Sequence, residues 1–127
     1  MFKELKWFFQ RGKKGYSDRD LWSPCEYLCT LIPPMMRDLA KRSYGCPGNL
    51  WDAKAKNNEC HRWEEVLEEI AQGFEAAKEL DTGCMITKKT EDGYYRMEFD
   101  KEKAKQCTTK FERGMFLFQK YFFSLWD

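Results

Sequence analysis

Apolar side chains recur at the spacing of an α-helix along three stretches of this chain. In the first, residues 18–42, they follow one another three or four positions apart: Leu21, Cys25, Leu28, Ile32, Met35 and Leu39. Such spacing is typical of one face of a helix. Ser17 precedes two aspartates, which predicts a helix N-cap with acids in the first turn. Pro33 and Pro34 should kink this helix, because neither has a backbone N–H to donate.

A second helical stretch follows a loop predicted over residues 43–58, which is rich in glycine and asparagine. Its apolar positions share one face: Trp63, Val66, Leu67, Ile70, Ala71, Phe74 and Ala77. Its glutamates fall opposite: Glu64, Glu65, Glu68, Glu69 and Glu75. The pattern predicts an amphipathic helix that begins after Asn57 or Asn58, ends near Asp81 and Gly83, and turns its glutamates to solvent.

The third stretch, about residues 100–126, begins at Asp100 and has an apolar face of its own: Ala104, Cys107, Phe111, Met115, Phe118, Phe122 and Leu125. Its last turns add further apolar residues on the other sides: Phe116, Leu117, Tyr121, Phe123 and Trp126. A helix that is apolar nearly all round must be buried on several sides. We therefore expect it at the centre of the bundle or against a second subunit, which would make the protein a homo-oligomer.

Two shorter elements complete the predicted fold. Residues 2–10 should form an amphipathic helix that Gly12 and Gly15 terminate. Residues 84–99 contain two β-prone runs about Asp92-Gly93, which predict a small hairpin, with a surface loop as the alternative. The fold class is mainly α: a compact bundle of three long helices with a short N-terminal helix and a small β-hairpin near 84–99, all in one domain over residues 1–127.

Composition and charge narrow the classes of partner. Aromatic residues make up 17% and charged residues 34% of the 127 positions, which argues against disorder. A net charge of +1 excludes the whole-protein basic character of a general nucleic-acid binder. The charge is uneven, because residues 1–14 are basic and residues 59–81 are acidic. These segments either pair after folding or leave the basic one to face a ligand.

The six cysteines do not form a recognisable framework. The basic, aromatic start of the chain has no signal-peptide pattern, which favours reduced thiols in the cytoplasm. Cys25 and Cys29 lie four apart and Cys60 adjoins His61, but the spacing of a zinc site is missing. We expect the cysteines to pack as small apolar residues, without a metal. No run approaches the length of a membrane span.

Catalytic patterns are also missing, so we predict a protein that is not an enzyme and needs no cofactor. His61 is the single histidine, and its neighbour Cys60 would point about 100° away on a helix, too far round for a nucleophile–base pair. The paired glutamates fit a solvated face better than acid–base chemistry. RGKKG lacks the pattern of a phosphate-binding P-loop.

The stretch RGKKGYSDRDLW, residues 11–22, is the strongest candidate for a ligand site. Its glycines let backbone amides approach a ligand, and its cations and the following helix start favour an anion. The candidate binding residues are Arg11, Lys14, Tyr16, Asp18, Arg19, Trp22 and Tyr44. Tyrosine and tryptophan could stack on a base. The aspartates could accept hydrogen bonds from ribose hydroxyls, or they could hold Arg11 or Arg19 in place. The alternative is a capped turn with Trp22 in the core.

Four segments resemble, in order, a group of small proteins of tailed bacteriophages that have no assigned activity. They are RGKKGYSDRDLW, YGCPGNL, WEEVLEEIAQGFE and FLFQKYFFSLWD. Members of that group typically carry a histidine in the second segment, where this chain has Tyr44-Gly45-Cys46-Pro47-Gly48. The resemblance implies a phage protein made in the cytoplasm of a bacterial host.

Small non-enzymatic phage proteins are often antagonists of host defence, and two routes fit the resemblance. One is a sponge that sequesters a nucleotide signal, a cyclic ADP-ribose or a cyclic dinucleotide. It predicts that Arg11, Lys14, Tyr16, Trp22 and Tyr44 converge on one pocket. The other is a protein–protein inhibitor of a host defence or metabolic enzyme, which predicts a flat exposed patch on the last helix. Neither route involves a membrane.

Overall fold

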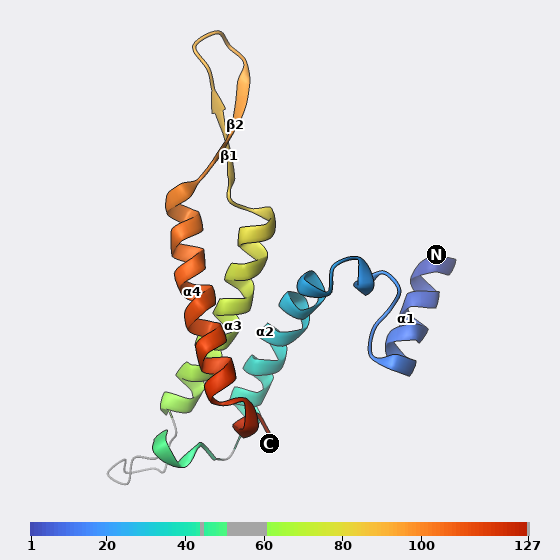
Figure 1. Cartoon of the computed structure of the whole chain (residues 1–127). Helices are drawn as coiled ribbons and strands as arrows, with labels where there is room; N and C mark the ends of the chain where they lie inside the picture. Colours follow the sequence, from blue (N-terminus) through green and yellow to red (C-terminus); the bar gives the residue numbers. More distant parts are fainter. Residues whose placement is uncertain (44, 51–60, 127) are drawn as a thin grey trace.

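The computed structural model describes residues 1–43, 45–50 and 61–126. Within them the protein is mainly helical, as predicted, and three helices pack together: α2 (Pro24–Arg42), α3 (His61–Thr82) and α4 (Lys101–Lys120). Helix α3 lies in the middle and contacts both α2 and α4 (Figure 1). The remaining long element, α1 (Phe2–Lys14), stands apart from this bundle on the far side of α2.

The apolar face of α3 forms the centre of the core. Six of its predicted positions are buried: Trp63, Val66, Leu67, Ile70, Ala71 and Phe74. Leu67 and Ile70 have no exposed surface at all. From α2, Cys29 and Met36 pack against this face. The periodicity therefore predicted the buried face of this helix correctly. The place of this helix between α2 and α4 was not predicted.

The glutamates of α3 join the helices instead of only facing solvent. Arg37 of α2 donates to Glu68 at 2.9 and 3.0 Å and also to Glu75. Arg113 of α4 donates to Glu69 at 3.0 Å. Charged side chains from both neighbours thus reach the acidic residues of the middle helix, which accounts for its composition.

Two glycines set the contact between α3 and α4. A Cβ added to Gly73 would lie 2.7 Å from the Cα of Gly114, and the reverse substitution gives the same distance. The backbones therefore touch at this crossing, which only residues without a side chain permit.

The last helix departs from its prediction in extent, phase and place. It ends at Lys120, and Tyr121 leads into a short 3-10 turn over Phe122–Ser124. Its buried residues are Ala104, Cys107, Gly114 and Leu117, whereas Met115 and Phe122 are exposed. The prediction that it is the central helix is wrong: α3 holds that place. The reason is the glycine contact, which turns the Gly114 side of α4 to the core.

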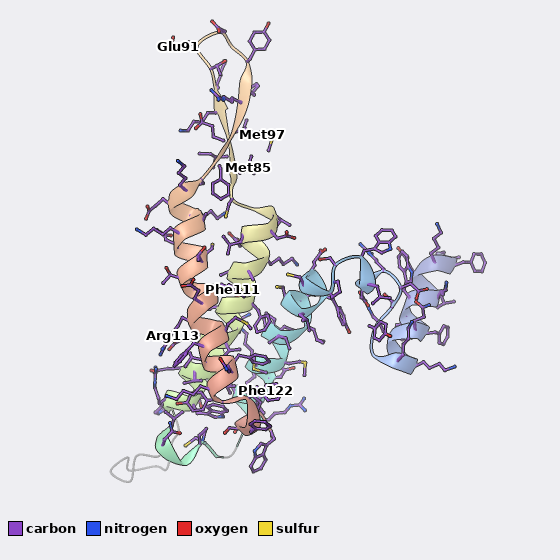
Figure 2. The ribbon with its side chains drawn as sticks, in the orientation of Figure 1. Met85, Glu91, Met97, Phe111, Arg113 and Phe122 are labelled. Carbon is purple, nitrogen blue, oxygen red and sulfur yellow. The ribbon has the colours of Figure 1, made fainter. Side chains whose placement is uncertain are left out.

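The predicted hairpin is confirmed between α3 and α4. Strands β1 (Met85–Lys89) and β2 (Tyr95–Phe99) pair antiparallel, with Met85 opposite Phe99 and Thr87 opposite Met97. Gly93 takes the left-handed conformation in the turn, with φ 82°. The hairpin projects beyond the helices (Figure 2). Its apolar residues on one face are exposed, since none of the described helices covers them.

Helix α1 begins and helix α2 ends where predicted, at Phe2 and Arg42, but the other end of each differs. Helix α1 passes through Gly12 to Lys14 and stops at Gly15, whose φ is 82°. Helix α2 starts at Pro24, six residues later than expected, with Ser23 accepting from the Glu26 N–H at 3.2 Å. Proline is preferred at the first position of a helix, and the preceding residues form a separate turn.

The cysteines are not all free, which corrects the expectation of six reduced thiols. Cys46 takes part in a disulfide. Cys29, Cys84 and Cys107 are buried free thiols, as the packing interpretation expects, while Cys25 is exposed. Burial raises the pKa of Cys29 to about 11, so this thiol stays protonated and unreactive at neutral pH.

Candidate functional site

A buried aspartate organises the stretch that the sequence singled out. Asp20 is only 8% exposed. Its carboxylate accepts two hydrogen bonds from the Arg11 guanidinium, at 2.9 and 2.5 Å. The backbone N–H and the hydroxyl of Ser17 also donate to it, at 2.7 and 2.8 Å. Ser17 is therefore not the N-cap of a long helix but part of a closed turn, which joins α1 to a short 3-10 helix (Asp20–Trp22).

The same contacts determine the charge state of this turn. The Arg11 guanidinium and the two donors from Ser17 hold the pKa of Asp20 far below its usual range, since each favours the carboxylate. A carboxyl with a lowered folded-state pKa stabilises the fold above its unfolded pKa and loses that effect as the pH falls. The Arg11–Asp20 pair is thus fully charged at neutral pH.

Further contacts fix α1 to the turn. Gln10 donates to the Asp18 carboxylate at 2.7 Å and accepts from the Asp18 N–H at 2.9 Å. Lys6 and Lys14 lie 3.3 and 3.4 Å from the same carboxylate. The Arg19 guanidinium stacks over Trp7 at 5.4 Å. Each of these contacts uses the side of α1 that faces the turn.

An open pocket of about 610 Å³ lies between this turn and the first half of α2. Its lining includes Arg11, Arg19, Asp20, Trp22, Glu26 and Tyr27. Tyr27 sits beneath Arg11, 5.4 Å from its guanidinium carbon, and donates its hydroxyl to the Gly15 carbonyl at 2.7 Å. The pocket has two cations and two carboxylates, so it is not a concentrated anion site.

The structure brings some of the predicted binding residues together and separates others. Arg11, Arg19 and Trp22 line the pocket. Lys14, Tyr16 and Asp18 do not: Lys14 stacks on Tyr16 at 4.7 Å, and Asp18 is bound by Gln10. Tyr44 lies outside the described residues. The alternative interpretation is half correct, because the capped turn exists but Trp22 is 83% exposed and is not in the core.

Similarity to other proteins does not decide between these interpretations. Neither a protein-family model, nor a curated protein, nor a solved structure matches this chain. Its function must therefore be inferred from its own geometry. Among the described residues, no helix combines the length and apolar character needed to cross a bilayer.

A second candidate surface lies where the chain leaves α4. Phe122, Phe123 and Trp126 are 53%, 91% and 73% exposed, and we call them the C-terminal aromatic surface. Phe118 connects it to the core, since its ring lies 5.5 Å from that of Phe74 and 5.6 Å from that of Phe122. Figure 2 shows Phe122 at the lower end of α4.

The aromatic rings of this surface contact one another and the core, while much of their area stays exposed to solvent. Phe122 and Phe123 meet edge to face at 5.4 Å. Beside Trp126 lies a second pocket, of about 400 Å³, which Trp63, Cys46 and Pro47 also line. The sequence predicts these aromatics on a continuous last helix, either inside the bundle or against another protein. The structure ends α4 at Lys120 and leaves them exposed beyond it.

Proposed function

We propose that this protein is a non-enzymatic binding protein that inhibits a host protein, docking on it through the C-terminal aromatic surface. The observation that carries the proposal is the exposure of Phe122, Phe123 and Trp126 at one end of the bundle. Aromatic side chains are the residues that most often dominate binding energy in protein interfaces. The resemblance to small phage proteins supports a bacterial host protein, of defence or metabolism, as the target.

The charges near this surface define the partner that fits it. The Lys120 ammonium lies 5.4 Å from the Tyr121 ring and 6.0 Å from the Phe116 ring. The Arg113 guanidinium, 5.8 Å from the Phe116 ring, is already paired with Glu69. The complement of an aromatic centre with the Lys120 cation at its edge is an apolar cleft with a carboxylate beside it, because opposite potentials steer association.

Binding experiments with surface variants test this proposal. Tagged wild-type protein should retain one partner from a bacterial host lysate, and the purified partner should then bind with a measurable dissociation constant. Phe123→Ala should weaken that binding at least tenfold, which corresponds to about 1.4 kcal/mol. Isothermal titration calorimetry with the purified pair would measure it.

The matched control is Phe99→Ala, because Phe99 is also an exposed phenylalanine, 54% accessible, but lies on β2 in the hairpin. It should leave the partner's affinity within twofold of wild type. Equal affinity of wild type and Phe123→Ala for the partner would contradict the proposal.

A nucleotide-derived signal is the second candidate ligand, and the pocket beside the turn is the observation that favours it. Trp22 and Tyr27 offer ring faces, and Arg19 offers a cation that pairs with no carboxylate in the described part of the chain. The first candidate is preferred because the Arg11 guanidinium is already occupied by Asp20, and because Glu26 adds a second negative charge to the lining.

A thermal-shift screen against cyclic dinucleotides and cyclic ADP-ribose isomers tests this candidate. A ligand at 100 times its dissociation constant should stabilise the protein by about 2.7 kcal/mol. Trp22→Ala should abolish the shift while leaving the unliganded transition unchanged, since Trp22 is exposed. Absence of a shift with every compound would remove the candidate.

A further inference from the structure

The apolar face of α1 points away from its own chain. Helix α1 has no buried residue. Lys6 and Trp7 also contact the turn, but the centre of its contacts is formed by Gln10, Arg11 and Lys14. At 100° per residue these lie on the side of the helix opposite to Phe2, Leu5 and Phe9. Those three, with Phe8, are 53–85% exposed. The polar anchors thus hold the helix with its apolar face in solvent, clear of the bundle (Figure 1).

Helix α2 has a second apolar stripe that nothing in the described chain covers. Its buried side, with Cys29, Pro33 and Met36, packs toward α3. A different side exposes Leu28, Leu31 and Met35, at 46%, 37% and 50%. These three are spaced i, i+3 and i+7, the same spacing as Phe2, Leu5 and Phe9 on α1. Apolar side chains with this spacing form a row along one face of a helix, and two such rows pack together when a pair of helices associates.

The exposed area of the chain exceeds what a folded monomer of this size shows. The accessible surface is 10096 Å², whereas a compact monomer of 15.3 kDa should expose about 7,100 Å². The difference, roughly 3,000 Å², is larger than the roughly 800 Å² that each partner buries in a standard interface. The separate α1, the projecting hairpin and the C-terminal aromatic surface all contribute to this surplus, which is large enough to include one protomer's share of a standard interface.

We propose that a second copy of this chain covers both stripes: the α1 face of each protomer packs on the α2 stripe of the other, in a reciprocal twofold dimer. Within one chain the two faces cannot meet while the Arg11–Asp20 and Gln10–Asp18 contacts hold, because these contacts turn the apolar side of α1 outward. In a twofold dimer the contact between α1 of one protomer and α2 of the other occurs twice, so it covers all four exposed stripes. This proposal does not rest on the proposed function, which uses the other end of the bundle.

Sedimentation of the full-length protein tests the dimer. Wild type at micromolar concentration should sediment at twice the mass of the 15.3 kDa chain. Phe9→Glu and Leu31→Glu should each shift the protein to a monomer, because each places a carboxylate in the proposed contact. Both positions are exposed in the protomer, so the helical circular dichroism of the variants should equal that of wild type.

Mixing two variants identifies the pairing. Phe9→Glu and Leu31→Lys proteins should each be monomeric alone and should form a mixed dimer together, since the mixture makes one native contact and one Glu–Lys contact. Phe123→Glu serves as the matched control and should remain a dimer. Three outcomes would overturn the proposal: a monomeric wild type, dimers that persist in both single variants, or a dimer that Phe123→Glu alone dissociates.

Discussion

Replacing Trp63 with alanine should lower the free energy of unfolding by about 3–5 kcal/mol, the usual cost of removing a large aromatic side chain from a core. Trp63 is 2% exposed and meets Tyr121 edge to face at 5.5 Å. The Tyr121 hydroxyl in turn accepts from the Asn49 amide at 3.1 Å. The substitution would therefore open a cavity where α3, the chain after α4 and the loop before α3 meet. Urea unfolding followed by circular dichroism measures the change.

The matched control is Trp22→Ala, which removes the same side chain from a site that is 83% exposed. It should change the free energy of unfolding by no more than about 0.5 kcal/mol. Both variants must be compared with wild type at one protein concentration, because association adds to apparent stability. Equal losses for the two tryptophans would contradict the core described above.

Gly73→Ala should destabilise the bundle by about 1–3 kcal/mol, the usual cost of overpacking. The new methyl group would meet the backbone of α4, the Cα of Gly114 at 2.7 Å and the carbonyl oxygen of Lys110 at 3.1 Å. Backbone cannot rotate away as a flexible side chain does, so α3 and α4 must separate. Thermal unfolding should show a lower midpoint even though alanine is the better helix former by about 0.5–1 kcal/mol.

Gly12→Ala provides the control for Gly73→Ala, because Gly12 is also inside a helix but a Cβ there meets nothing within 4 Å. This variant should match or exceed wild-type stability. The double variant with Gly114→Ala adds a further check. Its loss should be smaller than the sum of the single losses, since both methyl groups force apart the same crossing. Additive losses would indicate that the two glycines do not share one contact.

Local periodicity was sufficient to predict the elements whose burial follows from their own pattern. The apolar positions from Trp63 to Phe74 predict a helix and no other element, because only a helix places those residues on one side. The two runs about Asp92-Gly93 likewise predict a hairpin, since the glycine supplies the positive φ that the turn requires. These segments needed no knowledge of the rest of the chain.

The candidate site was found only in part. The sequence predicted a site in the segment from Arg11 to Trp22 and gave an aspartate that holds an arginine as one of its roles, as Asp20 holds Arg11. It could not tell that Lys14 and Tyr16 would stack on each other outside the pocket. Which side chains converge depends on the angle between α1 and α2, and a closed turn of few residues sets that angle.

The sequence alone determined the helical class, the buried face of α3, the hairpin and the two aromatic-rich ends of the chain. Tertiary structure alone decided which aromatics are buried: Trp63 lies in the core while Trp22 and Trp126 face solvent. It also decided the rotation of α4, through the contact of Gly73 with Gly114. The physical reason is that a side chain becomes buried only when a second surface packs against it. A pattern along one helix states how much apolar area must be covered, whereas the partner that covers it is chosen by close packing between segments distant in the chain.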